Sequence, residues 1–282
     1  MSRISYLNGE FLPHEKCFVH IEDRGFQFAD GAYEVTLFEN GKLVDGDLHI
    51  ERFFRSLREM KIEHNFSADF LRDIQLQLFA KNNLDFATCY MQITRGFANR
   101  VPYLPKDLNP TISATVSPGK KMPAQDFANG FSFETHDDIR WKRCDIKSVG
   151  LFAASMINQE AKNNGFDDAI FLRDGVVTEG SFANLFMVKN NVLITHPADN
   201  FILCGITRNR FIKLAASIGI KCEERKFTLD ELLNADEVFL TSSSLILRPA
   251  REINKKLIGK EGKNREMATK LNELYRLFVG SS

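Results

Sequence analysis

A polar, turn-rich stretch near the middle of the chain separates two parts that each mix strand and helix patterns. It runs Pro118-Gly119-Lys120-Lys121-Met122-Pro123, between strand-like sequence that ends at Ser117 and strand-like sequence that begins at Phe131. A chain of 282 residues can form two modest domains that each bury a core. We therefore expect a two-domain α+β fold, with a smaller N-terminal domain over 1–118, a linker over 119–130 and a larger C-terminal domain over 131–282.

The N-terminal part contains two hairpin patterns and two amphipathic helix patterns. Asn8-Gly9 and Asn40-Gly41 each separate two short strand-like runs, and both residue types tolerate the positive φ of a tight turn. Apolar residues then recur at helical spacing after Asp47, which is expected to cap the first helix. A second helix, capped by Ser67, is expected over 68–82.

The C-terminal part again mixes strands with helices. Helices are expected over 151–163 and 207–218, each followed closely by a glycine, and Thr228-x-x-Glu231 has the form of a capping box. A last helix near the C-terminus places one apolar stripe on a single face. Extended segments are expected at 131–136, 169–172, 184–188 and 192–195.

Composition excludes several classes of function. The 37 basic and 37 acidic side chains cancel, so no bulk charge recruits nucleic acid or an anionic membrane. The five cysteines are widely spaced and form no C-x-x-C pair, which argues against a metal site or a disulfide framework. The N-terminus carries no signal-peptide pattern, and no apolar run is long enough to span a bilayer. We expect a soluble cytoplasmic protein with reduced thiols and no metal.

A cationic segment offers the first candidate for chemistry. Arg140, Lys142, Arg143 and Lys147 lie within eight residues of one another. Charge alone favours a solvated strand edge. Neighbouring cations and burial also make a lysine amine lose its proton easily, and such an amine forms a Schiff base with an aldehyde. Both interpretations of Lys147 stay open on these residues alone.

An acidic residue at a strand end offers the second candidate. Glu179 lies in Val177-Thr178-Glu179-Gly180-Ser181, and taken alone it fits a carboxylate in a surface turn. Beside a Schiff-base lysine, the same carboxylate has a chemical use. It keeps a pyridine nitrogen protonated, so that the ring accepts electrons from a reacting carbon.

Several residues suit a phosphate, although each also has a purely structural interpretation. Gly205-Ile206-Thr207 opens a helix, where free N–H groups and the helix dipole favour an anion, but Thr207 also fits an ordinary N-cap. Ser242-Ser243 supplies hydroxyls for a phosphate or simply forms part of a polar loop. Arg52 points away from the apolar face of the first helix, where it is either solvated or closes a phosphate clamp.

Longer stretches of the sequence resemble a known family. Asp23-Arg24-Gly25-Phe26-Gln27-Phe28-Ala29-Asp30-Gly31-Ala32-Tyr33-Glu34-Val35 resembles the N-terminal signature of bacterial D-amino-acid (D-alanine) aminotransferases, which have the class IV, or fold type IV, aminotransferase fold. Arg140-Trp141-Lys142-Arg143-Cys144-Asp145-Ile146-Lys147-Ser148 resembles the segment that carries the cofactor lysine of that family. Val177–Ser181 and Gly205–Arg208 follow in the family's order, and the resemblance spans the chain from about Tyr6 to Phe278.

The resemblance implies pyridoxal 5'-phosphate as cofactor and assigns residues to it. Lys147 is expected to form the Schiff base and to be the catalytic residue, and Glu179 is expected to pair with the pyridine nitrogen. Residues expected to hold the phosphate are Arg52, the N–H groups of Ile206 and Thr207, and Ser242 with Ser243. Glu34 is expected to be structural.

The resemblance also assigns the substrate carboxylate, and here the sequence departs from the family. Tyr33 and Arg100 are expected to bind that carboxylate, with Arg100 contributed by the second subunit of a homodimer. The histidine that follows the arginine by two residues in the family is Pro102 here, and a polar residue after Glu-Gly-Ser is Phe182. Losing a hydrogen-bond donor weakens carboxylate binding by about 1 to 3 kcal/mol if nothing replaces it.

The expected activity is a ping-pong transamination between a D-amino acid, of the D-alanine type, and a 2-oxo acid. The same fold also serves branched-chain L-amino-acid transaminases, (R)-amine transaminases and aminodeoxychorismate lyases, so these remain alternatives. A non-catalytic protein that binds pyridoxal phosphate is the alternative outside enzymes. The sequence does not rank the amino donors or identify the 2-oxo acid.

Overall fold

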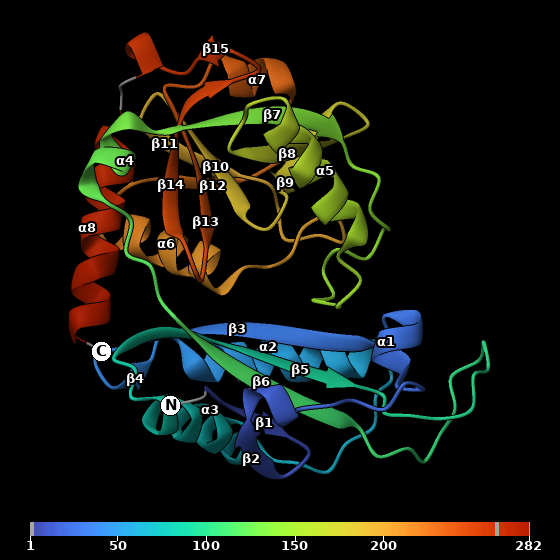
Figure 1. Cartoon of the computed structure of the whole chain (residues 1–282). Helices are drawn as coiled ribbons and strands as arrows, with labels where there is room; N and C mark the ends of the chain where they lie inside the picture. The colour runs from blue at the N-terminus through green and yellow to red at the C-terminus, as the bar shows by residue number, and fades with distance from the viewer. Residues whose placement is uncertain (1–2, 263–264, 282) are drawn as a thin grey trace. The chain divides into compact units, whose positions relative to one another are not determined.

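The structure, a computed structural model, describes residues 3–262 and 265–281 and divides into two compact units (Figure 1). The first contains residues 3–120 and Ile146–Gly150, and the second contains Lys121–Asp145 and Leu151–Ser281. Sheets and helices occur in both units, which confirms the α+β class. The division differs from the expected one in two places. Helix α4 lies inside the stretch expected as a linker, and the segment that carries Lys147 belongs to the first unit, not to the larger C-terminal part.

An antiparallel sheet of six strands forms the first unit, in the order β2-β1-β6-β5-β3-β4. Both expected Asn-Gly hairpins are present: Asn8 has φ 46° and Gly9 has φ 104°, and Asn40 and Gly41 also have positive φ. These values are ones that most other residue types avoid. The strands are β1 (Ile4–Leu7), β2 (Glu10–Pro13), β3 (Gly31–Glu39), β4 (Lys42–Leu43), β5 (Phe86–Thr94) and β6 (Thr111–Pro118).

Two long helices cover this sheet. Helix α2 (Gly46–Glu59) packs against β3, and α3 (Ala68–Asn82) packs against β1 and β6. Ser67 caps α3 as expected, because its hydroxyl accepts a hydrogen bond from the N–H of Phe70. Asp47 does not cap α2: the N-cap is Asp45, with φ 52°, and Asp47 lies in the first turn. A short helix α1 (Arg24–Phe28) and a 3-10 turn η1 (His14–Lys16) complete the unit.

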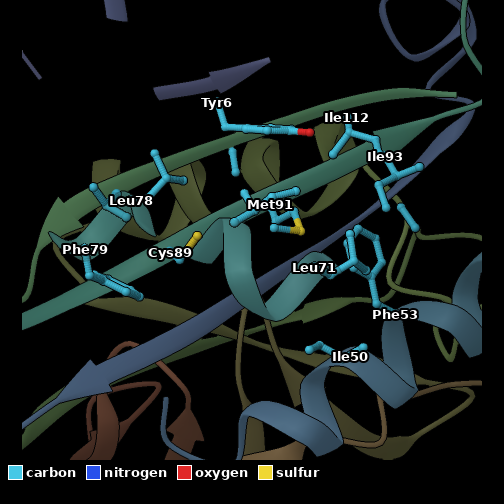
Figure 2. Close-up of a cluster of buried hydrophobic side chains, with 14 of the residues drawn as sticks. Tyr6, Ile50, Phe53, Leu71, Leu78, Phe79, Cys89, Met91, Ile93 and Ile112 are labelled. Atoms are coloured by element: carbon cyan, nitrogen blue, oxygen red, sulfur yellow. The ribbon is translucent and has the colours of Figure 1, made fainter. Parts of the chain in front are cut away.

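The core of the first unit lies between α2, α3 and the sheet (Figure 2). Phe53 from α2, Leu71 and Leu78 from α3, and Met91 from β5 are almost completely buried. Burying one such side chain stabilises the folded state by roughly 1.5–3 kcal/mol. The many apolar side chains buried between the helices and the sheet therefore hold the two together. This packing fixes β3, which carries Tyr33, one of the two residues expected to bind the substrate carboxylate.

The second unit is built on a larger mixed sheet in the order β12-β11-β10-β13-β14-β7-β8-β9, with β15 paired to β14. The pairs β7–β8, β7–β14 and β11–β12 are parallel, and the other pairs are antiparallel. The strands are β7 (Phe131–Asp137), β8 (Asp168–Arg173), β9 (Val176–Gly180), β10 (Asn184–Lys189), β11 (Val192–Thr195), β12 (Cys222–Glu224), β13 (Glu237–Ser242), β14 (Ile246–Ile253) and β15 (Lys256–Leu257).

Helices surround this second sheet. The expected capping box is present, since Thr228 Oγ1 accepts from the N–H of Glu231 and the Glu231 carboxylate accepts from the N–H of Thr228. Across the described residues, no helix is long and apolar enough to cross a membrane. The helices are α4 (Ala124–Asn129), α5 (Phe152–Asn163), α6 (Ile206–Ser217), α7 (Leu229–Leu233), α8 (Glu266–Ser281) and the 3-10 turn η2 (Lys260–Gly262).

Candidate active site

The backbone of the first unit holds Lys147 beside strand β3. The carbonyl of Lys147 accepts a 3.0 Å hydrogen bond from the N–H of Tyr33, and the N–H of Val149 donates to the carbonyl of Gly31 at 2.9 Å. The N–H of Lys147 also donates to Ser56 Oγ on α2 at 3.3 Å. Strand β3 and helix α2 therefore fix the backbone from which the amine projects.

The aromatic ring of Tyr33 lies next to that amine. Lys147 Nζ is 4.1 Å from the centre of the Tyr33 ring, a distance at which the ring face attracts a cation. Tyr33 is buried and stacks on Tyr90 of β5 with 5.4 Å between ring centres. Burial, with the neighbouring Tyr33, raises the pKa of Tyr90 to about 12, so Tyr90 is a neutral partner at ordinary pH. Lys147 and Tyr33 are thus brought together in the first unit.

Arg52 lies in a buried cluster on the same unit. Its Nε and Nη2 donate to the two carboxylate oxygens of Glu34 at 2.7 and 2.8 Å, and His49 Nδ1 lies 2.8 Å from Glu34 Oε2. Burial works to raise the pKa of Glu34, but the charge and hydrogen bonds of Arg52 and His49 outweigh it and hold that pKa well below its usual range. Arg52 is therefore neither solvated nor directed away from the protein, and Glu34 fixes its orientation.

In the second unit, Glu179 is buried at the end of β9 and held by three donors. Its Oε1 accepts from Arg140 Nη1 at 2.7 Å, and its Oε2 accepts from Asn184 Nδ2 at 2.9 Å and from the Leu203 N–H at 3.1 Å. Burial raises the pKa of Glu179, while Arg140 and the Leu203 N–H act to lower it. A carboxylate offers about four acceptor positions, so these three bonds leave Oε1 able to accept one more donor.

Arg140 is itself held on its other side. Asp138 accepts hydrogen bonds from its Nε at 2.8 Å and its Nη2 at 2.9 Å, and the guanidinium lies 4.3 Å from the centre of the Phe171 ring. Arg173 Nη2 is 3.0 Å from the same Asp138 carboxylate. Two cations and two carboxylates thus alternate along this chain of ion pairs, and Arg140 balances the charge of Glu179.

The cationic segment that drew attention in the sequence is largely paired with acids. Arg140 binds Asp138 and Glu179, and Arg143 Nε binds Asp145 at 2.9 Å. The unmatched positive charge that the sequence analysis used to explain a reactive lysine is therefore much reduced. No local pattern indicated that Arg140 pairs with Glu179, because the two residues are 39 positions apart.

The N-terminus of α6 presents free backbone donors. Helix α6 begins at Ile206, with Gly205 as its N-cap, and no side chain of the described residues caps it. Thr207 is therefore inside the first turn and is not the N-cap. A Cβ at Gly205 would lie 2.0 Å from Asn184 Oδ1, so only glycine fits this approach. The free N–H groups and the dipole of a 12-residue helix favour an anion at this point.

Hydroxyls from the neighbouring loop lie close to this helix start. Thr207 Oγ1 is 3.4 Å from Ser243 Oγ, and Ser242 Oγ accepts from the Leu245 N–H at 3.2 Å. Thr241 Oγ1 is buried and has no hydrogen-bond partner among the described residues. A hydroxyl in that state indicates a missing polar partner. The second unit therefore fits a group that carries both a phosphate and a ring nitrogen.

The two departures from the family lie on exposed turns. Arg100 is exposed in the first unit, with its guanidinium 5.1 Å from the Phe28 ring, and Pro102 follows in the same loop. Phe182 is 46% exposed at the tip of a tight turn that the Gly180 N–H closes on the Ala183 carbonyl at 2.7 Å. Pro102 and Phe182 are therefore both accessible to a ligand or to another protein chain.

The chain is similar to known proteins over most of its length. Residues 31–253 match the family model described as amino-transferase class IV. A D-alanine aminotransferase of Bacillus licheniformis is 42% identical over 252 residues, or 89% of each chain. One from Staphylococcus aureus strain N315 is 36% identical over 277 residues, or 98% of each chain.

Among solved structures, the branched-chain amino acid aminotransferase of Escherichia coli superimposes with a TM-score of 0.90. It is 24% identical, and the match covers 99% of this chain and 94% of that chain. A branched-chain amino acid aminotransferase of T.th., solved with pyridoxamine 5'-phosphate, also gives 0.90, at 22% identity and with 100% and 96% coverage. At these identities the likeness concerns the fold.

Proposed function

Because the chain belongs to the class IV aminotransferases, we propose that it transfers the amino group of a D-amino acid of the D-alanine type to a 2-oxo acid. The protein is a transaminase that uses pyridoxal phosphate, and relatives with 35–42% identity place it with the D-amino-acid enzymes. The observation that most supports the proposed site is the buried Glu179 carboxylate, balanced by Arg140 and able to accept one more donor.

The residues proposed for the site act on the reacting proton, on the ring nitrogen of the cofactor and on its phosphate. Lys147 bonds the cofactor and, once released, carries the proton of the substrate α-carbon on its Nζ. Glu179 holds a proton on the ring nitrogen. When bound, the cofactor supplies a protonated pyridine ring that accepts electrons from the reacting carbon. Arg52, the first-turn N–H groups of Ile206 and Thr207, and Ser242 with Ser243 hold its phosphate.

The substrate roles form the second part of the proposal. Tyr33 binds the substrate carboxylate, together with an Arg100 that comes from the second subunit of a homodimer. Pro102 cannot donate the hydrogen bond that a histidine supplies, and the half-exposed Phe182 adds apolar surface. We therefore expect weaker binding of dicarboxylate donors than of small or apolar D-amino acids. We also place the enzyme in the cytoplasm.

An activity assay with several donors tests the reaction class. Purified protein with pyridoxal phosphate and 2-oxoglutarate is given D-alanine, L-leucine, an (R)-amine or aminodeoxychorismate, and the products are measured. We expect pyruvate from D-alanine and little turnover of the others. Turnover of L-leucine alone would indicate a branched-chain enzyme. Pyruvate from aminodeoxychorismate without any 2-oxo acid would indicate a lyase.

A further inference from the structure

The charged groups around Glu179 form a chain that begins at Arg173 and ends at the Glu179 carboxylate. Arg173 binds Asp138, Asp138 binds Arg140 through two hydrogen bonds, and Arg140 binds Glu179 Oε1 at 2.7 Å. Glu179 is only 4% exposed. A buried carboxylate without a charged partner would take up a proton instead of staying ionised.

Two features show that Arg140 is more than an incidental partner. Its Nε and Nη2 donate to Asp138, and its guanidinium lies over the Phe171 ring. These contacts leave one nitrogen, Nη1, to donate to Glu179. The other two donors to Glu179 are neutral and bind the opposite oxygen, Oε2. Arg140 is therefore the cation that stabilises negative charge on Oε1, where the carboxylate has a remaining acceptor position.

We propose that Arg140 is a positioning residue for the reaction: it keeps Glu179 ionised and orients Oε1 toward the ring nitrogen of the cofactor, with Asp138 and Arg173 holding Arg140 in place. The proposal rests on the proposed role of Glu179. Arg140 acts through the carboxylate and does not itself move the substrate proton. A protonated Glu179 would be a poor partner for a protonated ring nitrogen, so losing Arg140 weakens both cofactor binding and turnover.

The pH dependence follows from the charges that face Glu179. Arg140 favours the ionised form, Asp138 disfavours it, and Arg173 acts mainly by neutralising Asp138. Burial raises the pKa of the neighbouring Cys144 thiol to about 11, so this thiol is neutral at ordinary pH. Removing Arg140 therefore raises the pKa of Glu179. The acid limb of the pH profile of kcat/KM should move to higher pH.

The test compares Arg140→Met with a matched control, Arg143→Met, in full-length protein loaded with pyridoxal phosphate. Arg143 lies three residues away and also pairs with an aspartate, since its Nε donates to Asp145 at 2.9 Å. The measurements are the dissociation constant of pyridoxal phosphate, from its visible absorbance, and the pH profile. We expect Arg140→Met to weaken cofactor binding about 10- to 100-fold, as for loss of a charged hydrogen bond, and Arg143→Met to leave it unchanged.

A double variant separates a positioning role from a purely structural one. If Arg140 acts through Glu179, adding Arg140→Met to Glu179→Gln should change the dissociation constant less than about twofold, although each single change weakens binding strongly. Arg140→Lys, which keeps the charge, should recover part of the affinity if Arg140→Met does not fold. Equal losses in both backgrounds, or a wild-type acid limb in Arg140→Met, would overturn the inference. Wild-type protein that binds no cofactor would instead overturn the proposed function.

Discussion

The Lys147 amine, which we propose bonds the cofactor, lies 4.1 Å from the centre of the Tyr33 ring. Replacing Lys147 by Ala should lower turnover by at least about 10²- to 10⁴-fold, because it removes a general base as well as the bond to the cofactor. The loss should be seen in the D-alanine assay while the circular dichroism spectrum stays the same. The matched control is Lys142→Ala, an exposed lysine of the same segment. Near-wild-type activity of the Lys147 variant would end this assignment.

The ion pairs of Glu34 lead to a prediction about the free energy of unfolding. Glu34→Gln removes the negative partner of Arg52 and leaves a buried cation, so unfolding should become easier by about 3–5 kcal/mol. Urea unfolding at pH 7 measures this change. Glu10→Gln, at an exposed position of β2, is the control. A variant as stable as wild type would show that the Glu34–Arg52 pair does not stabilise the first unit.

The same pair sets the direction of a pH effect. The pKa of Glu34 is lower in the folded protein than in the unfolded chain. Its contribution to stability is therefore complete above the unfolded pKa of about 4.3 and is lost as pH falls through the folded pKa. The stability gap between wild type and Glu34→Gln should narrow in acid. A gap that widened as pH fell would contradict the ion-pair account.

Residue types predicted part of the candidate site, and contacts between distant residues could not be predicted. Short motifs and the family resemblance both pointed to Lys147 and Glu179, whose roles stay predictions. Asn184, Arg140 and the Leu203 N–H were not predicted as the partners of Glu179. An ion pair between positions far apart in sequence depends on how β9 and the loop after β7 meet, and no periodicity of either segment contains that information.

Gly205 is the N-cap of helix α6, at the point where we propose that the cofactor phosphate binds. Gly205→Ala would place a Cβ 2.0 Å from Asn184 Oδ1, so either the helix start or Asn184 must move. We expect the dissociation constant of pyridoxal phosphate to rise about tenfold, roughly the effect of losing one hydrogen bond. Gly280→Ala, where a Cβ meets open space, is the control. Unchanged cofactor binding in Gly205→Ala would argue against an anion at α6.

Local sequence patterns predicted the presence of helices and hairpins better than they predicted the residue at which a helix begins. The Asn-Gly hairpins, the Ser67 cap and the Thr228 capping box are confirmed. The cap expected at Asp47 is wrong, and so is the alternative interpretation of Thr207 as an N-cap, since each residue lies inside the first turn of its helix. A polar residue at an N-cap and one in the first turn look alike in sequence, and only the backbone conformation distinguishes them.

The proposed homodimer can be tested by combining two chains that are each inactive. If Arg100 serves the partner's site, Arg100→Ala and Lys147→Ala chains should each be inactive alone. When both are co-expressed, mixed dimers contain one complete site. Random pairing gives about a quarter of wild-type activity, because half of the dimers are mixed and each has one working site. No recovery in isolated mixed dimers would place Arg100 in its own subunit's site, and an active Arg100→Ala chain would place it outside any site.

We propose that this chain holds pyridoxal phosphate on Lys147 and reacts with D-amino acids. The most direct measurement is the visible absorption spectrum of purified protein, recorded before and after adding D-alanine or L-leucine without a 2-oxo acid. We predict a yellow band that D-alanine bleaches and L-leucine leaves in place. Bleaching by L-leucine alone would contradict the D-amino-acid assignment. A protein that shows no visible band even after incubation with pyridoxal phosphate would contradict the claim as a whole.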